Sequence, residues 1–168
     1  MDLLKKQGVA WVITIAMILA AICIGCSKQQ GPGPAPDPSD PFVWDNARVL
    51  SDKTVRTLDQ RNERLWDNYS VTIGVVTCDY DKDDLGGYAM QCAEDMGLGG
   101  YDMIVVLDIK GDNYWLFQGA DIRRDFTDND CSDYAYNYME EWFAAGDYDF
   151  AVCQLTEMLE LWYGTYYG

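Results

Sequence analysis

The chain has 168 residues, a net charge of −16 and no histidine. A surface this acidic repels phosphate backbones, which disfavours nucleic-acid binding, and attracts cations and basic partners, although charge that serves only solubility would look the same. The absence of histidine excludes Ser-His-Asp and Cys-His catalysis and histidine zinc sites. An enzyme built from this chain would have to use carboxylates, hydroxyls, thiols, lysine or a metal.

An uncharged apolar run from Val9 to Cys26 follows Lys5 and Lys6. Its 18 residues are long enough to cross a bilayer as a slightly short helix. The lysines before it place residues 1–8 in the cytoplasm by the positive-inside rule. The sequence therefore predicts a single-pass plasma membrane protein, with residues 9–26 as a transmembrane signal-anchor and the domain that follows on the extracellular side.

Two alternatives to the transmembrane anchor also place the domain on the extracellular side of the membrane. The segment Ile24-Gly25-Cys26 resembles the end of a lipobox, which would make Cys26 the lipidated residue of a lipoprotein. Cys23, however, stands where a branched aliphatic residue is expected. A cleaved signal peptide is the other alternative, and the run is longer than the usual apolar segment of about 7–15 residues.

All five prolines of the chain lie in the segment 27–41, which follows this run. Such a stretch cannot pack and tends toward extended polyproline II, at about 3.1 Å per residue. We therefore expect a spacer that holds the next domain roughly 30 Å from the membrane. That domain is expected to occupy residues 42–168.

The first half of the domain alternates helical and extended patterns. Ser51 is a candidate helix N-cap, and the apolar spacing after it predicts a helix over 52–66. The β-branched run 71–76 predicts a strand. The apolar stripe from Leu85 to Met96 predicts a second helix, which Gly97 ends.

A second strand is predicted at 104–107. It should pair with the first strand in parallel, because a helix connects the two. After a tight turn at Ile109–Asp112, the residues Asn113–Gln118 should return antiparallel as a hairpin. These pairings together make a mixed sheet.

Two more helices complete the predicted domain. Thr127 is another N-cap candidate, and apolar stripes at 131–143 and 151–162 are separated by Gly146. The element order is therefore α-β-α-β-β-α-α. This order predicts an α/β domain, a small mixed β-sheet with helices on its faces, after one N-terminal transmembrane helix.

Ligands of open α/β sheets bind beyond the carboxyl ends of the parallel strands. Seven aspartates are expected at this edge of the predicted sheet. They are Asp45, Asp79, Asp81, Asp83, Asp108, Asp112 and Asp147. Crowded carboxylates repel one another, and a divalent cation that prefers oxygen ligands, Ca²⁺ or Mg²⁺, would relieve the repulsion. The predicted metal ligands are Asp45, Asp79, Asp81 and Asp147.

The same residues allow simpler interpretations. The acidic loop 79–84 begins with the aspartate spacing of an EF-hand, but Asp84 stands where such a loop needs glycine and Met90 where it needs glutamate. A solvated acidic loop is the simpler alternative. Asp45 would serve equally well as the capping aspartate of a turn.

Four cysteines lie in the domain without metal-ligand spacing: Cys78, Cys92, Cys131 and Cys153. An even number outside the cytoplasm permits disulfides, and the sequence leaves their oxidation state open. We expect free thiols packed in the core.

The order of short motifs along the domain resembles the TPM domain family. The match begins at Val43-x-Asp45-x-Ala47-x-Val49-Leu50-Ser51, ends at Phe143-x-x-Gly146-Asp147-Tyr148 and covers nearly the whole domain. The resemblance implies an αβα sandwich outside the cytoplasm, often on a membrane anchor. It also implies roles in maintaining membrane protein complexes, with acid phosphatase activity and calcium binding in some plant members.

These observations predict a membrane-tethered TPM-like module that binds cations, protein partners or both, in the assembly or maintenance of membrane protein complexes. The alternative is a metal-dependent, acid-phosphatase-like enzyme in which an aspartate cluster of Asp45, Asp79 and Asp147 holds a metal that activates water. The expected partners are the membrane, through the anchor, and a membrane protein, with no nucleic acid.

Overall fold

The computed structural model describes residues 42–80 and 82–168. The predicted cytoplasmic segment 1–8, the anchor 9–26, the spacer 27–41 and Asp81 lie outside the described residues. Within the described ranges, no helix has the length and apolarity needed to cross a membrane.

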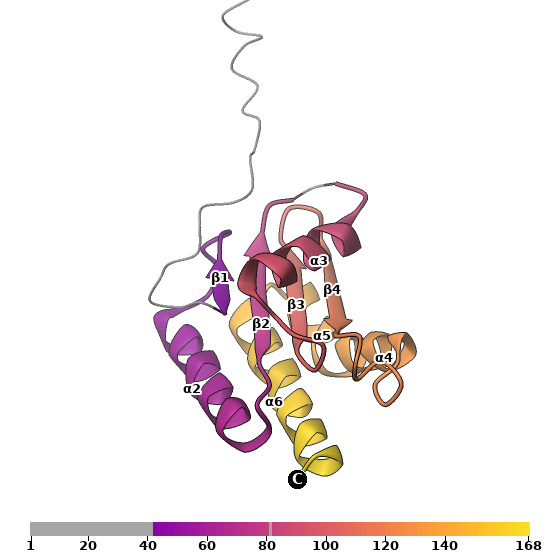
Figure 1. Ribbon diagram of the computed structural model, residues 1–168. Helices are drawn as coiled ribbons and strands as arrows, with labels where there is room; N and C mark the ends of the chain where they lie inside the picture. Colours follow the sequence, from indigo (N-terminus) through magenta and orange to yellow (C-terminus); the bar gives the residue numbers. More distant parts are fainter. Residues whose placement is uncertain (1–41, 81) are drawn as a thin grey trace, which may run out of the picture. The chain divides into compact units, whose positions relative to one another are not determined.

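A mixed sheet of four strands in the order β1-β2-β3-β4 forms the centre of the domain (Figure 1). The strands are β1 (Val43–Asp45), β2 (Ile73–Cys78), β3 (Met103–Asp108) and β4 (Asn113–Gln118). The first three pair in parallel, and β4 returns antiparallel to β3. The predicted parallel pair and hairpin are therefore confirmed.

The short strand β1 is the element that the sequence pattern missed. It has three residues, and its register places Val43 opposite Val75 and Asp45 opposite Thr77. Three residues are too few to show the period-2 alternation of a strand, so only the pairing with β2 defines it. The predicted order α-β-α-β-β-α-α was therefore wrong at its start, where a strand precedes the first helix.

The predicted third helix is in fact two helices. They are α4 (Asp128–Tyr138) and α5 (Glu140–Ala144), and Met139 between them has a φ of −126°, far from helical values. Met139 is buried, as are Ala135 before the break and Phe143 after it. The apolar stripe therefore predicted the burial of this segment correctly but not its break.

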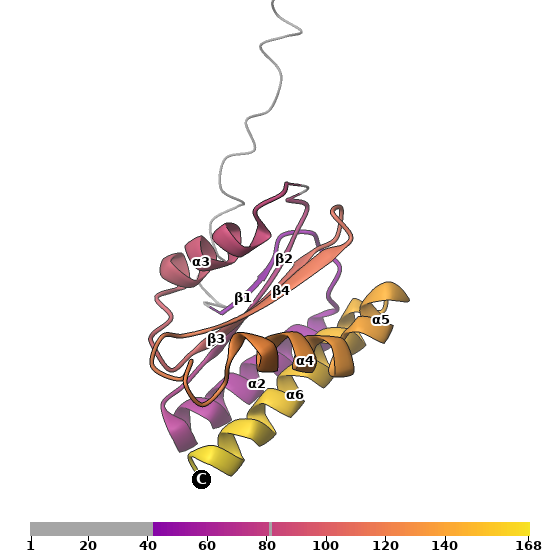
Figure 2. The ribbon, with the colours of Figure 1, turned by 90° about the vertical axis from the view of Figure 1, so that its right-hand side faces the viewer.

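Helices cover both faces of the sheet (Figure 2). Of the helices in residues 42–80 and 82–168, α2 (Asp52–Tyr69), α4, α5 and α6 (Tyr148–Tyr166) lie on one face, and α3 (Leu85–Met96) lies on the other. The larger core cluster, which includes Leu65 and Tyr163, lies under the four helices. The smaller cluster, which includes Val76 and Ala89, lies between the sheet and α3.

The predicted helix boundaries rest on caps that the structure confirms. The Ser51 side chain accepts the N–H of Thr54, and Thr127 forms a capping box with Asp130. Helix α3 ends at Gly97, whose φ of 73° lies in the left-handed region that favours glycine.

Arg61 joins α2 to α6 inside the domain. Its side chain is 7% exposed and donates to the Cys153 carbonyl, the Thr156 hydroxyl and the Glu160 carboxylate. Arg64 donates to the same carboxylate from the next turn of α2. Burial opposes ionisation of Glu160, but the hydrogen bonds from Arg64 and Arg61 outweigh it and lower its pKa.

Replacing Arg61 by alanine should lower the free energy of unfolding by about 3 kcal/mol, because the Cys153 carbonyl and the Glu160 carboxylate lose a buried donor. Urea unfolding followed by tryptophan fluorescence measures the change. The exposed Arg56 on the same helix is the control, and Arg56→Ala should change the free energy by less than about 0.5 kcal/mol. Equal losses in the two variants would contradict the role given to Arg61.

Candidate functional site at the carboxyl edge of the sheet

The carboxyl ends of β1, β2 and β3 meet at one edge of the sheet. In the strand register Asp45 lies opposite Thr77, and Cys78 lies opposite Asp108. The loops that leave these strands, toward α2, α3 and β4, are therefore neighbours (Figure 1). This is the place at which open α/β sheets bind ligands.

Asp45 holds the first of these loops together. Its carboxylate accepts hydrogen bonds from the N–H groups of Val49 and Leu50 and from the hydroxyl of Thr77 on β2. The Thr77 hydroxyl in turn accepts the N–H of Ala47 at 3.2 Å. One side chain thus joins the end of β1, the end of β2 and the approach to α2.

Asp108 joins the other two loops. It is 2% exposed, and its Oδ1 accepts the N–H of Tyr80 at 2.9 Å and the N–H of Gly111 at 3.1 Å. A Cβ added at Gly111 would lie 2.3 Å from the other carboxylate oxygen, so a larger residue there would displace this carboxylate. Asp79 precedes Tyr80 in the loop after β2, and its side chain is exposed.

Asp147 caps the N-terminus of α6, where its carboxylate accepts the N–H of Phe150 at 3.1 Å. Two residues later, Asp149 accepts the N–H of Ser51 and so ties α6 to the start of α2. Burial opposes ionisation of Asp149, but hydrogen bonds from Ser51 and Thr54 outweigh it and lower its pKa.

The four predicted metal ligands therefore differ in their surroundings. Asp45 and Asp147 accept backbone hydrogen bonds, Asp79 is exposed, and Asp81 lies outside the described residues. Among residues 42–80 and 82–168, no group of three or more His, Cys, Asp or Glu side chains is placed to hold a metal ion. The four-aspartate metal site stays a prediction.

Sequence reasoning gave no role to Thr77, although its hydroxyl bonds Asp45 and the residue is fully buried. A threonine at the end of a β-branched run is typical of strands in general, so no signal separated it from a packing residue. Asp108 lies at the expected edge, but as a buried link between two loops.

The thiols near this edge are not activated. All four cysteines in the described part of the chain are free, as expected. Burial raises the pKa of Cys78, at the end of β2, to about 12, and the Asp108 carboxylate adds to the effect. Because the thiolate is the nucleophilic form, Cys78 is a poor nucleophile.

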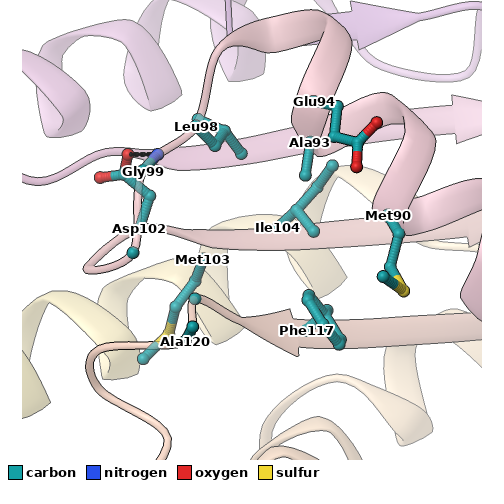
Figure 3. A pocket seen from close by; sticks show the side chains of 12 residues that line it. Met90, Ala93, Glu94, Leu98, Gly99, Asp102, Met103, Ile104, Phe117 and Ala120 are labelled. Carbon is teal, nitrogen blue, oxygen red and sulfur yellow. Dashed lines mark hydrogen bonds between the residues drawn. The ribbon is translucent and has the colours of Figure 1, made fainter.

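A separate cavity of about 240 Å³ lies at the opposite end of the sheet, between α3 and the strands β3 and β4 (Figure 3). Ile104 and Phe117 form part of its apolar lining. The Asp102 carboxylate accepts the N–H groups of Gly99 and Thr72, both at 2.6 Å. The backbone therefore engages the Asp102 carboxylate, and Glu94 is the other acidic side chain among the residues that line this cavity (Figure 3).

The sequence profile of the TPM domain matches residues 43–160, from β1 into α6. The chain belongs to the TPM domain family. No curated protein sequence matches it. Family membership agrees with the resemblance carried by the short motifs.

Solved structures share the fold of this TPM domain at low sequence identity. The N-terminal domain of a P. gingivalis protein is 19% identical, with a TM-score of 0.66 over 73% of this chain and 82% of that one. The N-terminal domain of cg2496 from Corynebacterium glutamicum is 20% identical, with a TM-score of 0.58 over 78% and 82%. BA42 from Bizionia argentinensis is 14% identical, with a TM-score of 0.56 over 67% and 79%.

The first TPM motif, from Val43 to Ser51, has a physical explanation in this structure. It contains β1, the Asp45 carboxylate and the backbone N–H groups of Val49 and Leu50 that this carboxylate accepts. The motif therefore describes a hydrogen-bonded turn that leads from the first strand into α2.

Replacing Asp45 by alanine should lower the free energy of unfolding by about 3 kcal/mol, because two backbone N–H groups and the Thr77 hydroxyl lose their acceptor. Asp79→Ala, at an exposed position of the same edge, should change it by less than about 0.5 kcal/mol. Urea unfolding of both variants gives the comparison. An Asp45→Ala protein as stable as the wild type would show that the carboxylate does not hold the turn.

Proposed function

We propose that this TPM domain is a binding module that takes a divalent cation at the carboxyl edge of its sheet, while an N-terminal tether holds it on the outer side of the membrane. Two kinds of carboxylate at the edge support the cation site. Asp45 and Asp108 fix the loops through backbone hydrogen bonds, and Asp79, Asp83 and Asp112 are exposed on those loops. Loops fixed in advance reduce the entropic cost of gathering ligands around an ion.

The chemistry of the exposed groups selects the kind of ion. Carboxylate oxygens suit Ca²⁺ or Mg²⁺, and the mutual repulsion of the aspartates favours binding of a cation. Asp79 is the proposed ligand with the least competition from backbone donors. Both oxygens of Asp45 and one oxygen of Asp147 already accept backbone N–H groups, which leaves fewer lone pairs for an ion.

A binding role fits this edge better than catalysis. The Cys78 thiol has a raised pKa, and the chain has no histidine to act as a general base. A phosphatase here would depend on metal-activated water. We propose that the module acts in the assembly or maintenance of membrane protein complexes, the role implied by the TPM resemblance.

Calcium should raise the melting temperature of the full-length protein in detergent micelles by about 5 °C at a concentration about tenfold above its dissociation constant. Asp79→Asn should remove most of this shift. Asp133→Asn removes the same charge from an exposed position of α4 and should keep the shift. Equal shifts in all three proteins would indicate general charge screening and contradict the site.

The same proteins separate binding from catalysis. Calcium binding without release of phosphate from a generic phosphate ester supports the binding role. Phosphate release that requires the metal and is lost in Asp79→Asn would replace it with metal-dependent phosphatase activity.

The tether has its own test. Intact mass spectrometry of the protein from the membrane fraction should find residues 1–8 retained, because an anchor is not cleaved. Protease added outside intact cells or spheroplasts should digest the domain. A mature chain that begins at a lipidated Cys26 would identify a lipoprotein and rule out the transmembrane anchor.

A further inference from the structure

A groove of about 700 Å³, which we call the α2 groove, runs along α2 at the β1 end of the sheet (Figure 1). Its lining comes from α2, from Phe42 just before β1 and from Thr72 just before β2. Asn62 of α2 also lies in the lining, and its side chain donates to the carbonyl of Ile73 and accepts the Ile73 N–H. These two hydrogen bonds hold the helix against the start of β2, so the walls of the groove are fixed.

Three carboxylates follow one another along the helical wall of this groove. Asp59, Glu63 and Asp67 are four residues apart, so they lie about 6 Å apart along one face of α2. No hydrogen bond or ion pair from another residue of 42–80 or 82–168 reaches their side chains. The neighbouring arginines of α2 bond Glu160 of α6 instead. Like charges at this spacing destabilise a helix, and a cationic occupant would relieve the repulsion.

Two further groups in the lining suit a chain that carries cations. Trp66 is 61% exposed, and the face of an indole ring attracts a guanidinium or ammonium group. Thr72 is only 3% exposed, yet its hydroxyl has no hydrogen-bond partner in the part of the chain that the structure describes. A buried hydroxyl without a partner is unfavourable. An occupant of the groove that donates a hydrogen bond would satisfy it.

Charge distinguishes between the possible occupants. The chain's own segment 29–41, which leads to Phe42, has two aspartates and no basic residue, so the three carboxylates would repel it. A second copy of the chain would bring another net charge of −16. A partner segment with lysine or arginine would be attracted. Of these two residues, arginine also stacks on an aromatic face such as that of Trp66.

The spacing of the carboxylates favours an extended occupant. An extended chain rises about 3.3 Å per residue, and every second side chain points to the same side. Basic residues at alternate positions would therefore lie roughly 6.6 Å apart on that side. This distance is close to the separation of about 6 Å between successive carboxylates on the helix. Each basic side chain can then face one carboxylate of the groove.

We propose that the α2 groove binds an extended segment of a partner protein that has arginine or lysine at alternate positions. The three carboxylates of α2 pair with the basic side chains, the Trp66 ring stacks on a guanidinium, and the Thr72 hydroxyl accepts a hydrogen bond. Phe42 and Thr72 precede β1 and β2, so they lie at the end of the sheet opposite the carboxyl edge. Binding in this groove therefore does not depend on the cation proposed for that edge.

The test uses the full-length protein in detergent micelles and rhodamine-labelled serine octapeptides that carry three arginines. Fluorescence anisotropy measures affinity, and the peptide with arginine at alternate positions should bind. A peptide with the three arginines side by side should bind about threefold more weakly, because adjacent side chains of an extended chain point to opposite sides. A peptide with glutamate in place of arginine should not bind measurably, because the charges then repel.

Matched double variants separate the groove from the overall negative charge of the protein. Glu63→Gln with Asp67→Asn removes two charges from the groove and should weaken binding of the alternating peptide by about fivefold. Asp133→Asn with Glu141→Gln removes the same two kinds of charge from exposed positions of α4 and α5. This control should bind within about twofold of the wild type, because distant surface charges are screened by salt.

Two single substitutions test the ring and the hydroxyl. Trp66→Ala should weaken binding by about threefold, whereas Tyr136→Ala removes a ring that is 69% exposed on α4 and should keep the wild-type affinity. Thr72→Val removes the hydroxyl and keeps the shape of the side chain. It should weaken binding by about threefold without lowering the midpoint of urea unfolding, because the lost hydroxyl had no partner in the free protein.

Photo-crosslinking identifies the occupant directly. Benzoylphenylalanine in place of Trp66 should crosslink to the alternating arginine peptide on irradiation. Crosslinks to residues 29–41, or to a second copy of the chain, would assign the groove to that occupant and overturn the proposal. Failure of the alternating peptide to bind, or equal loss of affinity in the two double variants, would overturn it as well.

Discussion

The hydrogen bond between Asp45 and Thr77 holds the shortest strand of the sheet in place. With three residues, β1 has a short ladder with β2, and the Asp45 carboxylate adds the Thr77 hydroxyl and two backbone N–H groups to it. Those two groups belong to the turn that leads into α2. The path of α2, and with it the packing of Leu58 and Leu65 in the larger core, depends on this constraint.

The helices cover the two faces of the sheet unequally, and this explains why part of β4 is exposed to solvent. Among the described helices, α2, α4, α5 and α6 cover one face, whereas α3, with 12 residues, is the one that covers the other. Gly86 of α3 allows the Trp115 ring to approach, since a Cβ there would lie 3.3 Å from it. The helix nevertheless leaves Trp115 half-exposed at the sheet edge.

Several arginines form ion pairs with neighbouring carboxylates, so the excess of negative charge remains on the other acidic side chains. Arg61 and Arg64 share Glu160, and Arg124 lies beside Asp125. The remaining acidic side chains dominate the field around the domain. The cation proposed for the carboxyl edge follows from this excess. The edge supplies exposed oxygen ligands at Asp79, Asp83 and Asp112.

The sequence alone determined the features that arise from local preference and periodicity. The apolar stripe of α3 predicted Leu85–Met96 with its observed bounds, the caps Ser51 and Thr127 were identified, and the turn at Ile109–Asp112 predicted the hairpin. Each of these signals lies within a few residues of the structure that it specifies, because capping, turn formation and amphipathic burial act over one or two turns of chain.

Only the tertiary structure decided where β1 lies, where the third helix breaks and what the aspartates do. Asp45 finds its hydroxyl partner 32 residues away, and Asp108 accepts an N–H that lies 28 residues before it. Whether a carboxylate is free for a ligand or already bonded to the backbone depends on such distant partners. A strand of three residues likewise exists only because a neighbouring strand completes its hydrogen bonds.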